Sequence, residues 1–149
     1  EAAVASGKQV VLLSAGRGPL PLLAGAQAWD ERHPDGRGLT GAVLLYPQLY
    51  VGTPEPGHDA DYLPVVGATR LRIAILQPQL SPWHWQLDRL KAELERGDSK
   101  VTVQSLAGVR DRFYFRPETT PAEFALTARV PALLRGAVTE LLSAQKPPR

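Results

Sequence analysis

Few side chains in this sequence stand where hydrolytic chemistry would need them. Ser14 directly follows the apolar run Val10–Leu13 and precedes a Gly-Arg-Gly turn. A serine hydroxyl is inert near neutral pH unless a base removes its proton and a third group orients that base. His84 could approach the same region from an expected helix, but a packed or solvent-tipped histidine is the commoner role. We therefore expect the Ser14 hydroxyl to bond to backbone and not to act as a nucleophile.

A metal site is only weakly indicated. His58, Asp59 and Asp61 lie close together in a proline-rich stretch, and their side chains are possible ligands. Three loop residues without further histidine or cysteine make a poor site, so solvated turn residues are the favoured interpretation. His33 lies in a Pro- and Gly-rich loop and carries no signal. We expect no metal and no cofactor.

An anion site is the binding hypothesis that the residue types favour most. The turn at Gly16, Arg17 and Gly18 leads into an expected helix, and a helix N-terminus offers unpaired N–H groups and a positive dipole end. Arg110 and Arg112, with Arg116, could gather at the same edge of the sheet, where α/β proteins usually bind ligands. The alternative is that the glycines serve only a tight strand-to-helix turn.

Apolar runs and turn residues predict the elements that position these groups. Strands are expected at 10–14, 41–46, 71–77 and 100–106, and helices at 19–30, 83–96 and from 121 onward. Residues 61–68 are expected to hold one or two helical turns after a long irregular connection. Helices between successive strands predict an α/β fold with a mainly parallel sheet of about four strands, covered on both faces as a three-layer αβα structure.

Local signals refine this pattern. Ser81 and Pro82 are expected to cap the second long helix, and Gly97 to end it. Thr120, with Pro121 and Glu123, has the pattern of a capping box, and Pro131 should kink or divide the helix that follows. The all-apolar first strand is expected to be buried on both faces, whereas the alternating fourth strand is expected nearer a sheet edge.

In the order of its elements the chain resembles the C-terminal half of an α/β-hydrolase. Val10–Gly18 matches the strand and nucleophile elbow, Ala42–Tyr46 the next strand, and the long connection after it the place of that family's lid. Leu71–Leu76 matches the strand before the catalytic acid, and Ala107–Phe113 the loop that bears the histidine. The resemblance covers nearly all 149 residues in layout.

Each catalytic position departs from that family. Gly16 stands where the Gly-x-Ser-x-Gly pattern has its nucleophile, Ser81 where it has the acid, and Asp111 where it has the histidine. These three residues cannot form a nucleophile, a base and an orienting group. The resemblance therefore implies a hydrolase-like domain that has lost its triad.

The resemblance also implies strands beyond the first one. Without them, Val10–Ser14 would be an exposed apolar sheet edge, which promotes association. We considered a rearranged sheet, a dimer across that edge, and an N-terminal half missing from the chain. Because the chain begins at Glu1 and contains no methionine, we favour a fragment of a longer protein, alone or combined with a dimer.

Composition excludes several classes of protein. The chain has 149 residues, a formal charge of +2 and a pI near 9.2, which fits one globular domain and does not imply nucleic-acid binding. No apolar run is long enough to span a membrane. The absence of cysteine excludes disulfides and thiol catalysis within this chain. Residues 146–149 are expected to form a tail or linker.

The leading interpretation is a non-catalytic, α/β-hydrolase-like binding or interaction domain of a larger bacterial protein. Its bias toward Arg, Ala, Leu, Gly and Pro suits a GC-rich bacterial genome, and the thiol-free chain favours the periplasm slightly. A protein partner, or self-association, is expected at the edge of residues 10–14. The alternatives are an esterase completed by a missing N-terminal part or a partner subunit, and an anion-binding site at the Gly16–Arg17 turn.

Overall fold

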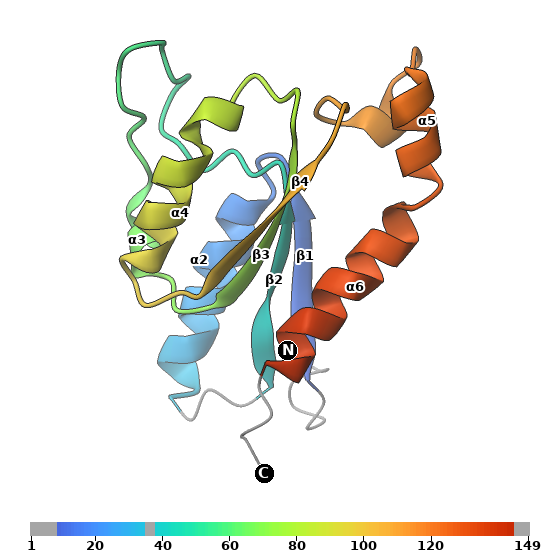
Figure 1. The fold of residues 1–149 in the computed structure, drawn as a ribbon. Helices are drawn as coiled ribbons and strands as arrows, with labels where there is room; N and C mark the ends of the chain where they lie inside the picture. The colour runs from blue at the N-terminus through green and yellow to red at the C-terminus, as the bar shows by residue number, and fades with distance from the viewer. Residues whose placement is uncertain (1–8, 35–37, 145–149) are drawn as a thin grey trace.

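The four apolar runs form one parallel sheet in a computed structural model that describes residues 9–34 and 38–144. Its strands are β1 (Val10–Ala15), β2 (Leu39–Leu45), β3 (Arg72–Pro78) and β4 (Val101–Leu106). They lie in the order β1-β2-β3-β4, and every neighbouring pair is parallel. All four carboxyl ends therefore meet at one edge of the sheet, the upper edge in Figure 1.

Helices cover both faces of this sheet (Figure 1). On one face lie α2 (Pro19–Arg32), α3 (Pro64–Ala68) and α4 (Leu87–Glu95). On the other face α6 (Val130–Ser143) packs over β2 and β3, and α5 (Pro121–Thr127) leads into it. The expected three-layer α/β architecture is thus confirmed.

Two apolar clusters, one on each face, form the core. Because side chains alternate along a strand, neighbouring residues of β2 and β3 contribute to different clusters. Leu44, Ile73 and Ile75 pack against Leu23 of α2 and Leu94 of α4, all fully buried. Val43, Ala74, Leu76, Leu106, Val109, Phe113, Ala137 and Leu141 are among the buried members of the α6-side cluster.

The C-terminal helices begin and divide as the sequence predicts. The Thr120 hydroxyl accepts a hydrogen bond from the Glu123 N–H at 3.2 Å, and the Glu123 carboxylate accepts one from the Thr120 N–H at 3.0 Å, which completes the capping box. The helix is interrupted at Ala128–Arg129, and Pro131 lies in the first turn of α6. That position suits proline because the N–H groups there have no partner within the helix.

The position of β1 differs from the sequence expectation. It is an edge strand and is not buried on both faces, since the Leu13 side chain is 54% exposed. An apolar run without charged residues cannot by itself distinguish a central strand from an uncovered edge. The strand order also excludes a rearranged sheet that would hide β1, whereas the expected edge character of β4 is confirmed.

Two local expectations around α4 also change. The segment begins with a short 3-10 turn, η1 (His84–Gln86), so the α-helix starts later than Pro82 suggests. Gly97 is not in the left-handed conformation, which Asp98 adopts with φ 70°. Gly97 is required for space, because a Cβ there would overlap the Thr69 carbonyl oxygen.

Among the described residues, no helix combines the length and apolarity needed to cross a membrane. The expected tail at 146–149 lies outside the described residues.

Candidate functional site

The turn between β1 and α2 has the backbone of an elbow with no side chain at its tip. Gly16 adopts φ +59°, a left-handed conformation that favours glycine. Its N–H donates to the Leu45 carbonyl at 3.0 Å, and its carbonyl accepts from the Gln48 N–H at 2.7 Å. Main-chain bonds to the segment after β2 therefore fix the tip at the carboxyl edge of the sheet.

Ser14 lies underneath this turn. A Cβ added at Gly18 would overlap the Ser14 hydroxyl oxygen, so Gly18 allows the turn to close over that side chain. Within the described residues, no hydrogen bond joins Ser14 to a histidine or carboxylate. The elbow thus offers Ser14 no general base in the described structure.

The other two positions singled out by the resemblance lie together. Ser81 follows β3 and is 8% exposed, and its hydroxyl donates to Asp111 Oδ2 at 3.1 Å. The Ser81 oxygen also accepts the Trp83 N–H at 3.3 Å. Residues far apart in sequence are joined because both follow neighbouring strands at their carboxyl ends.

Asp111 occupies an unusual electrostatic position. Burial raises the pKa of its carboxyl, while the Ser81 hydrogen bond and the positive charges of Arg116 and Arg112 oppose that rise. Its Oδ1 atom is buried and has no hydrogen-bond partner among the described residues. A carboxylate is also a much weaker base than an imidazole, so the Ser81–Asp111 pair is poorly suited to activating a serine.

Aromatic side chains surround this pair. The Tyr46 hydroxyl hydrogen-bonds to the Tyr114 hydroxyl at 2.7 Å, and the rings of Tyr50 and Trp83 lie 5.5 Å apart. Burial raises the pKa of Tyr46 and of Tyr50, so both phenols are neutral at physiological pH. Tyr46 and Tyr50 were not selected from the sequence, although their position just after a buried strand could have indicated them.

The arginines expected to form an anion site have separate environments. The Arg110 guanidinium binds the buried Glu123 carboxylate through two contacts of 2.7 Å and also donates to the Glu118 carbonyl at 3.3 Å. Because this two-point ion pair holds the Arg110 side chain at the start of α5, Arg110 is not available to bind an anion. Arg17 and Arg112 are both exposed, and neither forms an ion pair within the described part of the chain.

The N-terminus of α2 offers less to an anion than its sequence suggests. Pro19 and Pro21 have no N–H group, the Leu20 N–H donates to the Arg17 carbonyl at 3.2 Å, and the Leu22 N–H donates to the Gly18 carbonyl at 3.4 Å. The first turn is therefore almost without free donors. Anion binding at this turn would depend on the side chains of Arg17 and Arg112.

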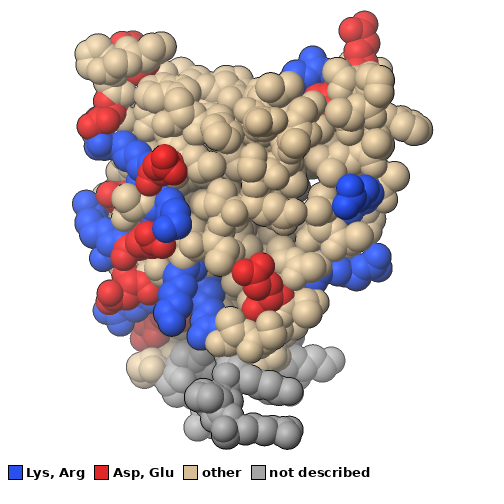
Figure 2. All heavy atoms as spheres, in the orientation of Figure 1, with Lys and Arg blue, Asp and Glu red and all other residues tan. Residues whose placement is uncertain are grey.

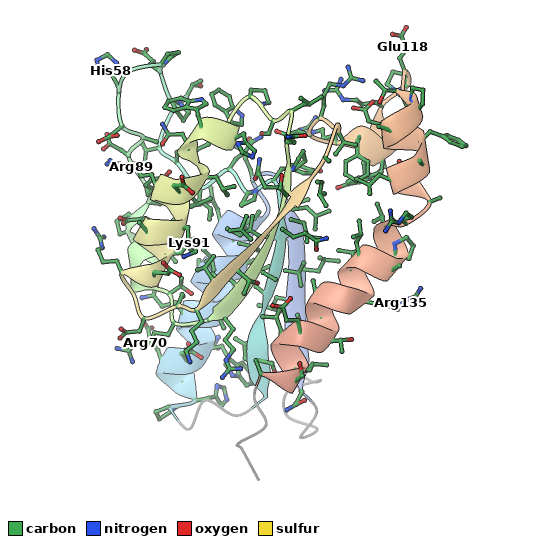
Figure 3. All side chains as sticks on the ribbon, in the orientation of Figure 1. His58, Arg70, Arg89, Lys91, Glu118 and Arg135 are labelled. Atoms are coloured by element: carbon green, nitrogen blue, oxygen red, sulfur yellow. The ribbon has the colours of Figure 1, made fainter. Side chains whose placement is uncertain are left out.

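The other candidate metal ligands, among them His33, His58 and Asp59, do not gather into one cluster in the described structure. Asp59 pairs with Arg89 of α4, which lies below the loop carrying His58 (Figure 3). His33 stacks on Trp29 with ring centroids 3.7 Å apart, at the end of α2. Among the described residues, no group of three potential ligands could hold a metal ion.

Charged side chains are few over part of the surface near the site in the view of Figure 2, while Arg17 and Arg112 are exposed at this end of the molecule. Lys, Arg, Asp and Glu are concentrated along the side formed by α3 and α4, whereas the end where the strands terminate is mostly uncharged in the view of Figure 2. Exposed apolar side chains contribute to this end, including Leu80, Trp85, Phe115 and Phe124. Such a surface is typical of a binding region.

Comparison with protein-family models, curated proteins and solved structures finds no match to this chain. We therefore infer the function of this chain from the geometry of the site.

Proposed function

We propose that this chain is a non-catalytic, α/β-hydrolase-like domain that serves as a binding or interaction domain of a larger bacterial envelope protein. The order of elements on which the resemblance depends is present, from the strand and glycine turn through to the C-terminal helix. The exposed apolar and aromatic side chains at the carboxyl end of the sheet support a binding role.

One observation carries the proposal. Gly16, Ser81 and Asp111 replace the family's nucleophile, acid and histidine, and Ser81 donates its hydroxyl to Asp111. Gly16 supplies no nucleophilic atom, and the carboxylate of Asp111 is too weak a base to activate Ser81. The site keeps the positions of a triad but lacks its chemistry.

Ester hydrolysis tests the proposal. We expect no turnover of p-nitrophenyl esters above the background reaction, because no hydrogen bond joins a described serine hydroxyl to a histidine, and the carboxylate of Asp111 that Ser81 contacts is a weak base. Turnover that Ser14→Ala abolishes would contradict it and would favour an esterase. Thr139→Ala is the matched control, since this exposed hydroxyl on α6 donates only to the Arg135 carbonyl.

Anion binding is a second candidate function. It is favoured by the exposed, unpaired guanidinium groups of Arg17 and Arg112 in the described structure. Arg17 also lies close enough to Tyr50 to oppose the rise in that phenol's pKa. Phosphate, sulfate and carboxylates can be compared by thermal shift, because a ligand at 100 times its Kd stabilises by about 2.7 kcal/mol. A shift that Arg17→Ala removes is expected; the absence of any shift would exclude this function.

The interaction surface that we propose is the open edge of β1. Among the described residues, β1 has a hydrogen-bonded neighbour on one side only, and the strand contains no charged residue. An extended segment of a protein partner, or of a second copy, could pair with it.

A further inference from the structure

The open edge of β1 presents three residues in a regular pattern. The N–H of Val10 donates to the Gly38 carbonyl at 2.6 Å, and that of Gly16 donates to the Leu45 carbonyl at 3.0 Å, both toward β2. Because successive residues of a strand point their N–H and C=O groups to opposite sides, Val11, Leu13 and Ala15 direct theirs away from the sheet. These three outward-facing residues are spaced symmetrically about Leu13.

The side chains on this edge share that symmetry. Val11 and Ala15 are partly buried in the cluster beneath α6, whereas Leu13 between them is 54% exposed. α6 packs over β2 and β3 and leaves β1 largely uncovered. The most exposed apolar side chain of the strand is therefore at its centre.

The two edges of the sheet differ. β4, the opposite edge, exposes the uncharged polar side chains of Thr102, Gln104 and Ser105 together with the apolar Val103. β1 carries Val10–Leu13, without charge or proline. The two edges thus differ in their apolar exposure, since Leu13 of β1 is 54% exposed and Val103 of β4 is 37% exposed.

The helix beside β1 extends the uncharged surface. α2 has no charged residue before Asp30, and Pro21, Ala24 and Gly25 are exposed on it. A helix that is apolar on its outer side as well as its inner side is usually covered on both. A charged partner would find no complement here, whereas a second copy would meet an equally uncharged surface without like-charge repulsion.

We propose that a second copy of this chain covers the edge, with the two β1 strands antiparallel about a two-fold axis at Leu13. This inference rests on the proposed role as an interaction domain and names the partner. Val11 then pairs with Ala15 of the other copy, and Leu13 pairs with its own equivalent, so that each outward N–H and C=O group is used.

The oligomeric state of the purified chain tests the proposal directly. Light scattering after size-exclusion chromatography should give twice the chain mass of 16.2 kDa. Leu13→Lys places like charges on the axis and should restore the chain mass. Val103→Lys is the matched control, because Val103 is a 37% exposed apolar residue on the other edge. It should leave the dimer intact.

A cysteine variant tests the register without disrupting the dimer. The chain has no cysteine, so Leu13→Cys introduces a single thiol. Residues that exchange both hydrogen bonds in an antiparallel pair have Cα atoms about 5.5 Å apart, within disulfide range. Under mild oxidation, Leu13→Cys should form linked dimers much faster than Val103→Cys.

Three results would overturn this inference: a wild-type chain that stays monomeric at all concentrations, a dimer that survives Leu13→Lys, or equal rates of cross-linking for the two cysteine variants. None of them would affect the proposal of a non-catalytic domain, which the ester assay tests. Conversely, ester turnover would contradict that proposal and leave the dimer standing.

Discussion

The pKa values of two carboxyl groups, those of Asp111 and Glu123, are shifted in opposite directions. Burial raises the pKa of Asp111, whereas the Arg110 side chain and the Thr120 N–H lower the pKa of Glu123 to about 2. Glu123 is fully buried but completely paired, while Asp111 keeps one oxygen without a partner in the described structure. Their variants should therefore respond differently to pH.

Asp111→Asn should leave stability at pH 7 unchanged or raise it. The fold disfavours the charged form of Asp111, and an asparagine oxygen can still accept the Ser81 hydroxyl. Because the folded pKa is raised, the wild type should gain stability relative to the variant as pH falls through that pKa toward the unfolded value near 3.8. Thermal unfolding at several pH values measures this. A clear fall in Tm at pH 7 would show instead that the carboxylate charge stabilises the loop.

Glu123 should give the opposite dependence. Its folded pKa of about 2 lies below the unfolded value of 4.5, so its contribution is complete above pH 4.5 and is lost as pH falls toward 2. Glu123→Gln should lower the urea midpoint at pH 7 by breaking the pair with Arg110, and the difference from wild type should shrink in acid. Glu118→Gln, which changes an exposed carboxylate on the same segment, is the control. A difference that does not change with pH would contradict this role.

Helix α5 buries its charged side chain and exposes its largest apolar side chain. Its only charged residue, Glu123, is completely buried, whereas Phe124 is 75% exposed. The helix is attached through the Arg110–Glu123 pair and the capping box rather than through its largest apolar side chain. A hydrophobic pattern alone would place Phe124 in the core.

This reversal predicts unequal effects for two phenylalanines. Phe113→Ala should cost about 3–5 kcal/mol because that ring is fully buried in the cluster beneath α6. Phe124→Ala should change stability by no more than about 0.5 kcal/mol, as expected for an exposed position. Urea unfolding of both variants measures the difference. Comparable losses would mean that the outer face of α5 is covered.

Much of the element pattern could be predicted from the sequence because its signals are local. Continuous apolar runs predicted the first three strands and an alternating pattern the fourth, Pro19 predicted the start of α2, and Thr120 with Glu123 predicted the capping box. The edge position of β1 could not be predicted, because it depends on which strands are present. The sequence also did not reveal that Arg110 is paired and so unavailable to an anion, since its partner Glu123 lies in another element.

At the scale of the molecule, the parallel sheet brings the ends of four strands together at one edge. That arrangement could be predicted from the order of elements, and it explains why Ser81 and Asp111, which follow β3 and β4, lie within hydrogen-bond distance. It did not reveal the Tyr46–Tyr114 contact or the close approach of the Ser14 side chain to Gly18, which depend on side-chain packing.

We infer that the carboxyl ends of the strands hold a site without catalytic serine chemistry. Incubating the folded protein with a fluorophosphonate probe and measuring its intact mass tests that claim most directly. We expect an unchanged mass of 16.2 kDa, because Ser14 contacts no base in the described structure and Ser81 contacts only the weakly basic carboxylate of Asp111. A covalent adduct that Ser14→Ala or Ser81→Ala abolishes would contradict it.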